Sequence, residues 1–211
     1  MDDASSRADR PWWARLTIDT VAVVVLSTVA VLTAWCGFES SKWGGEMSIA
    51  FSQASSARVM SSDFASQARD ARSNDQSIWE QWVIATARND TQLVAYIEER
   101  FSPEFEVAFD AWTADGRVDQ GPFARPEYVP PGTADAQRLA ARADARYDAA
   151  LVNNARGDNY ALLTVLFALV LFLAAMSQRE IAKSGRRVLI GAAATFAVLG
   201  IVLLVTFQIK I

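Results

Sequence analysis

The sequence contains no histidine, one cysteine and three lysines among its 211 residues. Histidine is the commonest general base and the commonest metal ligand, so its absence argues against most hydrolytic and metal-dependent chemistry. A serine nucleophile would then need a lysine base, yet Lys42, Lys183 and Lys210 each stand beside the end of a long apolar segment. Glycine-rich phosphate loops and the HExxH, CxxC and GxSxG motifs are also missing. We therefore predict no enzyme, no catalytic residue and no cofactor-binding residue.

The single cysteine, Cys36, permits no disulfide within the chain. It lies near the end of an apolar run from Val21 to Phe38 that follows three arginines, as in a signal peptide or a lipoprotein precursor. The run is longer than the usual signal core of about 7–15 residues, and no small-x-small cleavage site follows it. Trp35 is too large for the residue before an acylated cysteine. We expect a retained membrane anchor in which Cys36 is a small packing residue.

Charged residues are missing from three long segments of the chain. There are 19 uncharged residues between Asp19 and Glu39, 20 between Asp158 and Arg179, and 22 between Arg187 and Lys210. A bilayer core about 30 Å thick needs roughly 20 apolar residues in a helix. Helices buried in a soluble bundle are the alternative, but they rarely stay uncharged for so long. We predict transmembrane helices at residues 16–38, 158–178 and 188–209.

Basic residues beside these segments predict the topology. Three arginines precede the first segment, and Arg179, Lys183, Arg186 and Arg187 lie between the second and the third. Because Lys and Arg are enriched on the cytoplasmic side, residues 1–15 and 179–187 are expected there. Residues 39–157 and 210–211 are then extracytoplasmic. Trp43 and Tyr160 suit the outer aromatic belt of such a protein.

The segment from Glu39 to Asp158 has 12 basic and 19 acidic residues, so it lacks the basic face that nucleic acid binding needs. We therefore expect the lipid bilayer as one partner and no nucleic acid. Two stripes of mostly small residues in this segment recur at alternating steps of four and three. The N-terminal stripe consists of Trp43, Met47, Ala50, Ala54, Ala57, Ser61, Phe64, Ala68 and Ala71, and the C-terminal stripe of Ala136, Ala140, Ala143, Tyr147, Ala150, Asn154 and Gly157.

Such heptad spacing is typical of paired helices. We predict an antiparallel stalk of residues 46–73 and 133–157, beginning after a kink at Gly44-Gly45. Arg138, Arg142, Arg146, Asp144 and Asp148 are expected on its solvent-exposed faces. Pairing of either stripe between two copies of the protein is the alternative, and the pattern does not separate the two.

The stretch from Asn74 to Gly132 is predicted to form a small helical tip. Ser77 with Glu80 resembles a capping box and predicts a helix start. Ser102-Pro103-Glu104 predicts a second start, followed by Phe105, Phe109 and Trp112 on one helix face. No segment alternates like a strand. The predicted fold class is all-α: three transmembrane helices plus an extracytoplasmic helical stalk with a helical tip.

Two clusters in the tip have a functional and a structural interpretation. Five acidic residues could form a divalent cation site, but they lack the spacing of a calcium loop, and we favour a solvated face: Glu98, Glu99, Glu104, Glu106 and Asp110. Six aromatic residues could form a partner groove, but a domain of this size needs them for its core: Trp79, Trp82, Phe101, Phe105, Phe109 and Trp112. We predict no metal site.

Polar residues in the first apolar segment could line a pore: Thr17, Thr20, Ser27, Thr28 and Thr33. Such residues more often form hydrogen bonds within or between packed helices. Ionisable residues inside the spans would mark a transport path, and only Asp19 approaches this, within one turn of the cytoplasmic end of the first span. In the third segment Gly191 with Thr195, Ala193 with Ala197, and Ala192 with Gly200 place small residues at helical spacing, which favours close helix packing.

The stretch from Thr33-Ala34-Trp35 to Lys42-Trp43-Gly44-Gly45-Glu46, with the closely spaced last two spans, resembles uncharacterised bacterial inner-membrane proteins of the same plan. That resemblance implies a bacterial inner-membrane location and carries over no functional residue. The leading hypothesis is a non-enzymatic structural or interaction protein that associates with itself or with another membrane protein. The alternative hypothesis is a subunit of a channel or transporter.

Overall fold

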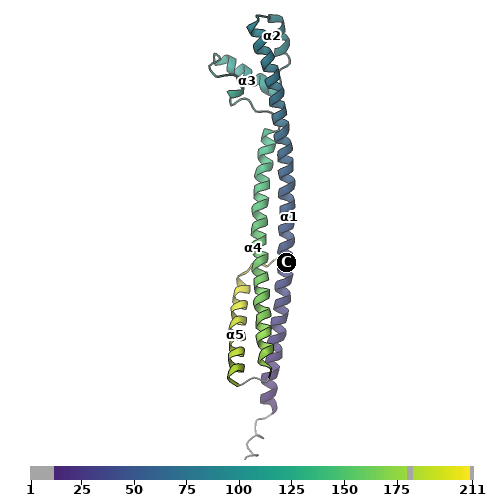
Figure 1. The fold of residues 1–211 in the computed structure, drawn as a ribbon, viewed down its shortest axis with the longest axis vertical. Helices are drawn as coiled ribbons and strands as arrows, with labels where there is room; N and C mark the ends of the chain where they lie inside the picture. Colours follow the sequence, from purple (N-terminus) through teal and green to yellow (C-terminus); the bar gives the residue numbers. More distant parts are fainter. Residues whose placement is uncertain (1–11, 180–182, 210–211) are drawn as a thin grey trace, which may run out of the picture. The chain divides into compact units, whose positions relative to one another are not determined.

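The computed structural model describes residues 12–179 and 183–209, with side chains described for residues 23–179 and 184–209. These residues form five α-helices and one 3-10 turn: α1 Trp12–Ala87, α2 Thr91–Glu98, α3 Pro103–Ala114, η1 Pro122–Ala124, α4 Thr133–Ser177 and α5 Lys183–Thr206 (Figure 1). Since this described part of the chain contains no strand, the predicted all-α class is confirmed. The predictions for residues 1–11, 180–182 and 210–211, and for the side chains of Thr17, Asp19 and Thr20, lie outside it.

Three of the helices, α1, α4 and α5, are long and apolar enough to cross a membrane. The predicted spans 16–38 and 158–178 fall on α1 and α4, with the second reaching one residue past Ser177. The span predicted at 188–209 falls on α5, which ends three residues earlier, at Thr206. The protein therefore has the helices of a multi-pass membrane protein.

Helix α1 runs without interruption through two positions where the sequence predicted a change. Gly44 and Gly45, expected at a kink, both lie inside it. The helix start predicted at Ser77 is wrong: the Ser77 hydroxyl donates to the carbonyl of Ser73, 3.0 Å away, within the same helix. Because this hydroxyl bonds back to residue i−4 inside the helix, it does not cap a helix start, and the apparent capping box begins no helix here.

The chain folds into two compact units. Unit 1 comprises residues 1–49 and 149–211, and unit 2 comprises residues 50–148. In unit 1, α4 runs antiparallel to both of its neighbours (Figure 1). The Ser40 hydroxyl on α1 donates to the carbonyl of Gly157 on α4 at 3.0 Å, and the Tyr160 phenol on α4 donates to the carbonyl of Gln208 at 2.9 Å. The buried core includes Val29, Cys36, Trp43, Leu163, Phe167, Val170, Ala193 and Ala197.

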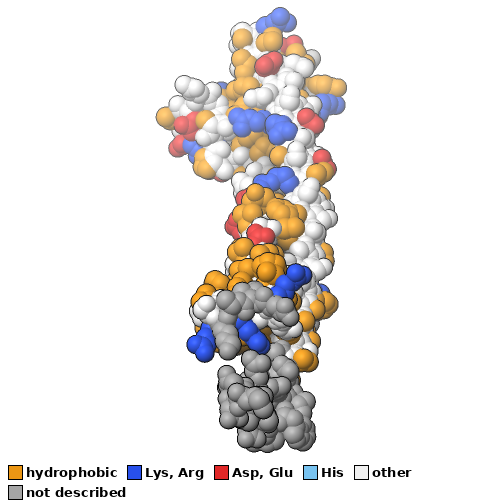
Figure 2. Space-filling model, turned by 60° about the horizontal axis from the view of Figure 1, so that its bottom comes forward, with side chains coloured by type: hydrophobic (Ala, Val, Ile, Leu, Met, Phe, Trp, Pro, Cys, Tyr) orange, Lys and Arg blue, Asp and Glu red, His pale blue; other side chains and the backbone are white. Residues whose placement is uncertain are grey.

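Small residues permit close packing in unit 1. A methyl group added at Gly200 would lie 2.7 Å from Cε1 of Phe167, so only glycine fits against that ring. Ala193 and Ala197 are also buried, as their predicted packing requires, whereas Gly191 and Thr195 are exposed. Large apolar side chains of all three helices point outward, among them Val31, Leu162 and Val205. Figure 2 shows hydrophobic side chains gathered in a broad band. A bilayer would cover such a surface.

In unit 2, the N-terminal stripe is the buried face of α1. Ala50, Ala54 and Ala57 are each at most 7% exposed, and Ser61 is 8% exposed. The partner is α4 of the same chain: the Ser61 hydroxyl donates to the carbonyl of Ala136 at 2.8 Å, and Phe51 meets Tyr147 edge-on at 5.5 Å between ring centroids. These pairs show that the two segments run antiparallel.

The C-terminal stripe was predicted less accurately. Ala143, Ala150 and Gly157 are buried, but Tyr147 is 48% exposed and Asn154 is exposed. The Asn154 amide instead donates to Asp158 on its own helix at 3.1 Å. Leu139, which the stripe omitted, is buried. The five charged side chains predicted for the solvent-exposed faces are all exposed.

The tip of unit 2 has a core of its own, formed by α2, α3, η1 and the last turns of α1. Its buried residues are Trp82, Ala85, Ile97, Phe105, Ala108, Phe109, Trp112 and Tyr128. Helix α3 begins as predicted, because the Ser102 side chain caps it by accepting from the Phe105 amide at 3.2 Å. Since α1 supplies part of this core, the predicted boundary between stalk and tip at Asn74 falls inside a helix.

Gly132 connects the tip to α4 by a conformation that only glycine adopts easily. Its φ is +87°, and a Cβ there would lie 2.8 Å from the carbonyl oxygen of Phe64 on α1. Both the left-handed backbone and the close approach therefore require glycine.

Candidate functional site

The six aromatic residues noted in the sequence are part of the tip core. Trp79 stacks on Trp82 with 4.9 Å between centroids and an interplanar angle of 12°, and both contact Phe109 and Trp112 edge-on. Trp82 is 5% exposed and Phe105 is fully buried. Edge-on and offset pairs are the preferred aromatic geometries in protein cores. The burial favours the core interpretation over an open groove.

The five acidic residues of the tip are not arranged as metal ligands. Among residues 12–179 and 183–209, no three acidic, histidine or cysteine side chains lie close enough together to hold a metal ion. Glu98 instead accepts a hydrogen bond from the Trp82 indole at 2.8 Å. Glu106 and Asp110 are exposed on α3.

A buried polar pair, Asp75 and Tyr128, was not predicted. The Tyr128 phenol donates to Oδ2 of Asp75 at 2.8 Å, joining α1 to the loop after η1. Burial, followed by the hydrogen bond to Asp75, raises the pKa of Tyr128 well above its ordinary value, despite the nearby Arg72 guanidinium. The 3-4 spacing of Ala68, Ala71 and Asp75 continues the N-terminal stripe, and this was the signal that Asp75 lies on the buried face.

A second unpredicted element is the ion-pair cluster around Arg125. Its guanidinium lies 2.8 Å from both Asp115 and Asp119, and 3.4 Å from Glu127. The two aspartates raise the pKa of Arg125 by accepting its hydrogen bonds. These contacts close the loop between α3 and α4 on itself. Three acidic residues and one arginine are therefore used to hold a loop rather than to bind a ligand.

The outer face of α2 carries exposed apolar side chains. Leu93 is 41% exposed and Tyr96 is 54% exposed, and their i, i+3 spacing places them side by side. The Arg100 guanidinium lies 3.4 Å from the Tyr96 ring centroid, and it donates to the Tyr96 carbonyl at 2.7 Å. Of these three residue types, tyrosine and arginine are enriched in binding hot spots, whereas leucine is not.

In unit 1, Glu39 is fully buried, although we predicted it as the first residue beyond the span. It interacts electrostatically with Cys36 and Tyr160. Glu39 follows Cys36 by three residues and precedes Trp43 by four, and this spacing places all three on one face of the helix. A buried carboxyl group beside an apolar span is a rare feature, and such residues are usually functional or paired.

Two threonine hydroxyl groups of the first span bond within their own helix. Thr28 donates to the carbonyl of Val24 and Thr33 to that of Val29, each at 2.8 Å. Their hydrogen-bond donors are therefore used within the helix, which favours packing over a pore lining.

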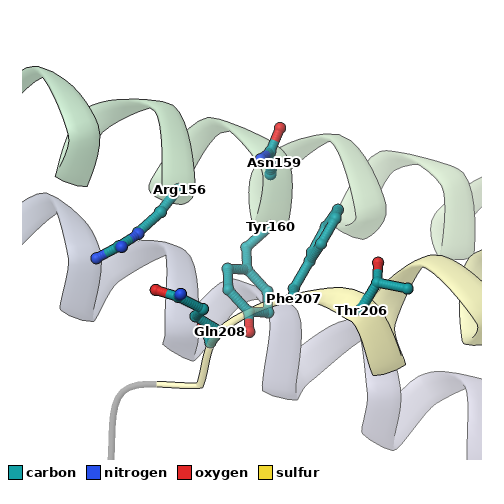
Figure 3. A pocket seen from close by; sticks show the side chains of 6 residues that line it. All are labelled: Arg156, Asn159, Tyr160, Thr206, Phe207 and Gln208. Carbon is teal, nitrogen blue, oxygen red and sulfur yellow. Dashed lines mark hydrogen bonds between the residues drawn. The ribbon is translucent and has the colours of Figure 1, made fainter.

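A hollow of about 190 Å³ lies where the end of α5 meets the middle of α4 in unit 1 (Figure 3). Its described lining combines the rings of Tyr160 and Phe207 with four polar side chains, those of Arg156, Asn159, Thr206 and Gln208. The Tyr160 and Phe207 rings meet edge-on at 5.5 Å. The Arg156 guanidinium lies 4.7 Å from the Trp43 ring centroid. The sequence placed Trp43 and Tyr160 at a membrane interface but did not predict the hollow.

Comparisons of the chain with protein-family models, with curated proteins and with solved structures found no match.

Proposed function

We propose that this protein is a non-enzymatic structural or interaction protein of a bacterial inner membrane. In this proposal the N-terminus is cytoplasmic and unit 2 is extracytoplasmic, where its tip contacts another membrane protein or a second copy of the chain. The charge pattern around the three apolar helices supports this orientation. The resemblance to bacterial three-span proteins supports the location.

The observation that carries the interaction proposal is how the tip uses its side chains. Asp75, Glu98 and Arg125 all bond to groups within the tip. Leu93 and Tyr96 of α2 face outward instead. An exposed aromatic residue beside an exposed leucine on a short helix is suited to presenting a surface to a partner.

Photo-crosslinking in living cells tests this function. A benzophenone amino acid replaces Tyr96 in one variant and Gln137, exposed on α4, in the control. The proposal expects a discrete crosslinked product from position 96 and much less from position 137. Mass spectrometry of the product separates self-association from binding of another protein. Equal or absent crosslinking at the two positions would count against a binding surface on α2.

A channel or transporter subunit is the second candidate from the sequence. Planar-bilayer recording of the purified protein addresses it directly. Ion-selective conductance that changes in Thr28→Leu would displace the structural proposal. The hydrogen bond from Thr28 to its own helix favours no change.

A further inference from the structure

The hollow between the middle of α4 and the end of α5 contains one charged group in its described lining, the guanidinium of Arg156. The ring of Trp43 lies 4.7 Å from this guanidinium. A stacked arginine is pre-oriented, so little side-chain freedom is lost when it binds a ligand. Figure 3 shows the Arg156 and Gln208 side chains extending toward the same side, away from Thr206. This arrangement offers a cation and an amide donor to one anion.

The hollow stands at the polar end of two apolar segments, one in α4 and one in α5. Arg156 precedes the uncharged segment 159–178 by a few residues, and α5 ends at Thr206. Aromatic and arginine side chains at this level are typical of the membrane interface. A ligand that reaches the hollow from the bilayer is therefore already at headgroup depth.

Exposed apolar side chains continue from the hollow along both helices. On α4, Leu162 and Leu169 share the face of Asn159 and are 69% and 41% exposed. On α5, Val202 and Leu199 share the face of Thr206 and are 56% and 48% exposed. Acyl chains of a lipid bound at the hollow would lie along these faces.

We propose that the hollow binds the phosphate of an anionic glycerophospholipid from the leaflet at the C-terminal end of α5. Arg156 binds the phosphate oxygens in the bidentate manner that guanidinium allows. The side-chain amide of Gln208 donates to the same group. The small volume accepts the headgroup, while the acyl chains stay outside, against the exposed leucine and valine side chains.

Native mass spectrometry of the full chain in detergent tests this site. Delipidated protein is titrated with phosphatidylglycerol, with phosphatidylcholine, and with inorganic phosphate as competitor. We expect one retained phosphatidylglycerol per chain and weaker retention of phosphatidylcholine. Arg156→Gln should reduce the retained phosphatidylglycerol about tenfold, since a hydrogen bond to a charged group is lost. Arg146→Gln, on the same helix but in unit 2, is the matched charge control and should leave retention unchanged.

Other results would overturn the proposal. Equal loss in Arg156→Gln and Arg146→Gln would mean that only net charge attracts the lipid. Displacement of the lipid by inorganic phosphate at equal concentration would mean that the site takes free phosphate. If Arg156→Gln does not fold, Gln208→Ala carries the test, with about a threefold reduction expected from one lost neutral hydrogen bond. Unchanged retention in Gln208→Ala would then reject the site.

Discussion

The phenol of Tyr128 donates a 2.8 Å hydrogen bond to Asp75, and both side chains are buried, 53 residues apart in the sequence. This bond fastens the loop before α4 to the last third of α1. Because the bond needs the phenol proton, the free energy of unfolding of the tip depends on whether Tyr128 is protonated.

The first prediction concerns alkaline pH. The folded state raises the pKa of Tyr128 above its ordinary 10.0, so the folded state keeps a proton that the unfolded state loses first. The stabilisation is complete below about pH 10 and falls as the pH rises further. Urea unfolding of the full chain in detergent between pH 8 and 11 should show this decline, with a smaller slope in Tyr128→Phe. The same slope in both proteins would show that Tyr128 is not responsible.

The second prediction concerns the α1–α4 contact in unit 2. Ala54 is 7% exposed, and Leu in its place must separate two closely packed helices, at about 1–3 kcal/mol. Ser56 is exposed on the same helix, and Ser56→Leu should change stability by no more than about 0.5 kcal/mol. Thermal unfolding followed by circular dichroism compares them. Loss of assembly at Ala54→Leu with unchanged helix content would locate the N-terminal stripe between chains instead.

The third prediction separates two reasons for glycine in the loops of unit 2. Gly132 and Gly116 both have positive φ, +87° and +75°, but only Gly132 lies against other atoms. Gly116→Ala should cost about 1–2 kcal/mol from the left-handed backbone alone. Gly132→Ala should cost clearly more, because the new methyl group collides with the Phe64 carbonyl. Similar unfolding free energies for the two variants would contradict the close approach.

The fourth prediction applies the same comparison to α5. Gly200→Ala places a methyl group 2.7 Å from the Phe167 ring, whereas Gly191→Ala meets nothing within 4 Å. We expect Gly200→Ala to lower the thermal midpoint in detergent. Gly191→Ala should be neutral or slightly stabilising, because alanine favours the helix by about 1 kcal/mol over glycine. Equal shifts would mean that α4 and α5 do not pack through Gly200.

The fifth prediction tests the orientation. Ser73 is exposed on α1, so Ser73→Cys combined with Cys36→Ala supplies one accessible thiol. A membrane-impermeant maleimide should label it in intact cells or spheroplasts if unit 2 is extracytoplasmic. A cysteine replacing Ser184, beside the loop between the last two spans, should be labelled only after lysis. The opposite pattern would invert the topology.

Periodic features of the sequence predicted much of the fold. Charge-free length located three helices, and the 3-4 spacing of Ala50, Ala54 and Ala57 located the buried face of α1, because both patterns follow directly from helix geometry. The capping box at Ser77 misled, since a local motif does not start a helix when the preceding turns are already helical. The spacing of the aromatic residues predicted one face of α3. It did not predict the contacts between those rings and the rings of α1.

The candidate sites were harder to predict because they depend on contacts between distant residues. The sequence around Asp75 does not predict its contact with Tyr128. The sequence around Arg125 does not predict that three nearby acidic side chains contact its guanidinium. The hollow near Arg156 arises only when the end of α5 meets α4. Such sites combine residues whose sequence separation carries no periodic signal.

Helix α1 supplies buried positions to both units within one unbroken run from Trp12 to Ala87. Deleting a single residue between Trp43 and Ala50 would turn every later side chain by about 100° around the helix axis. The alanines that meet α4 would then lose their helical phase with Cys36 and Trp43, the buried residues of unit 1 on the same helix. The gene can therefore lengthen or shorten this region only in blocks of about seven codons, matched by a block of equal size in α4. Loops such as the one between α2 and α3 are free of that constraint.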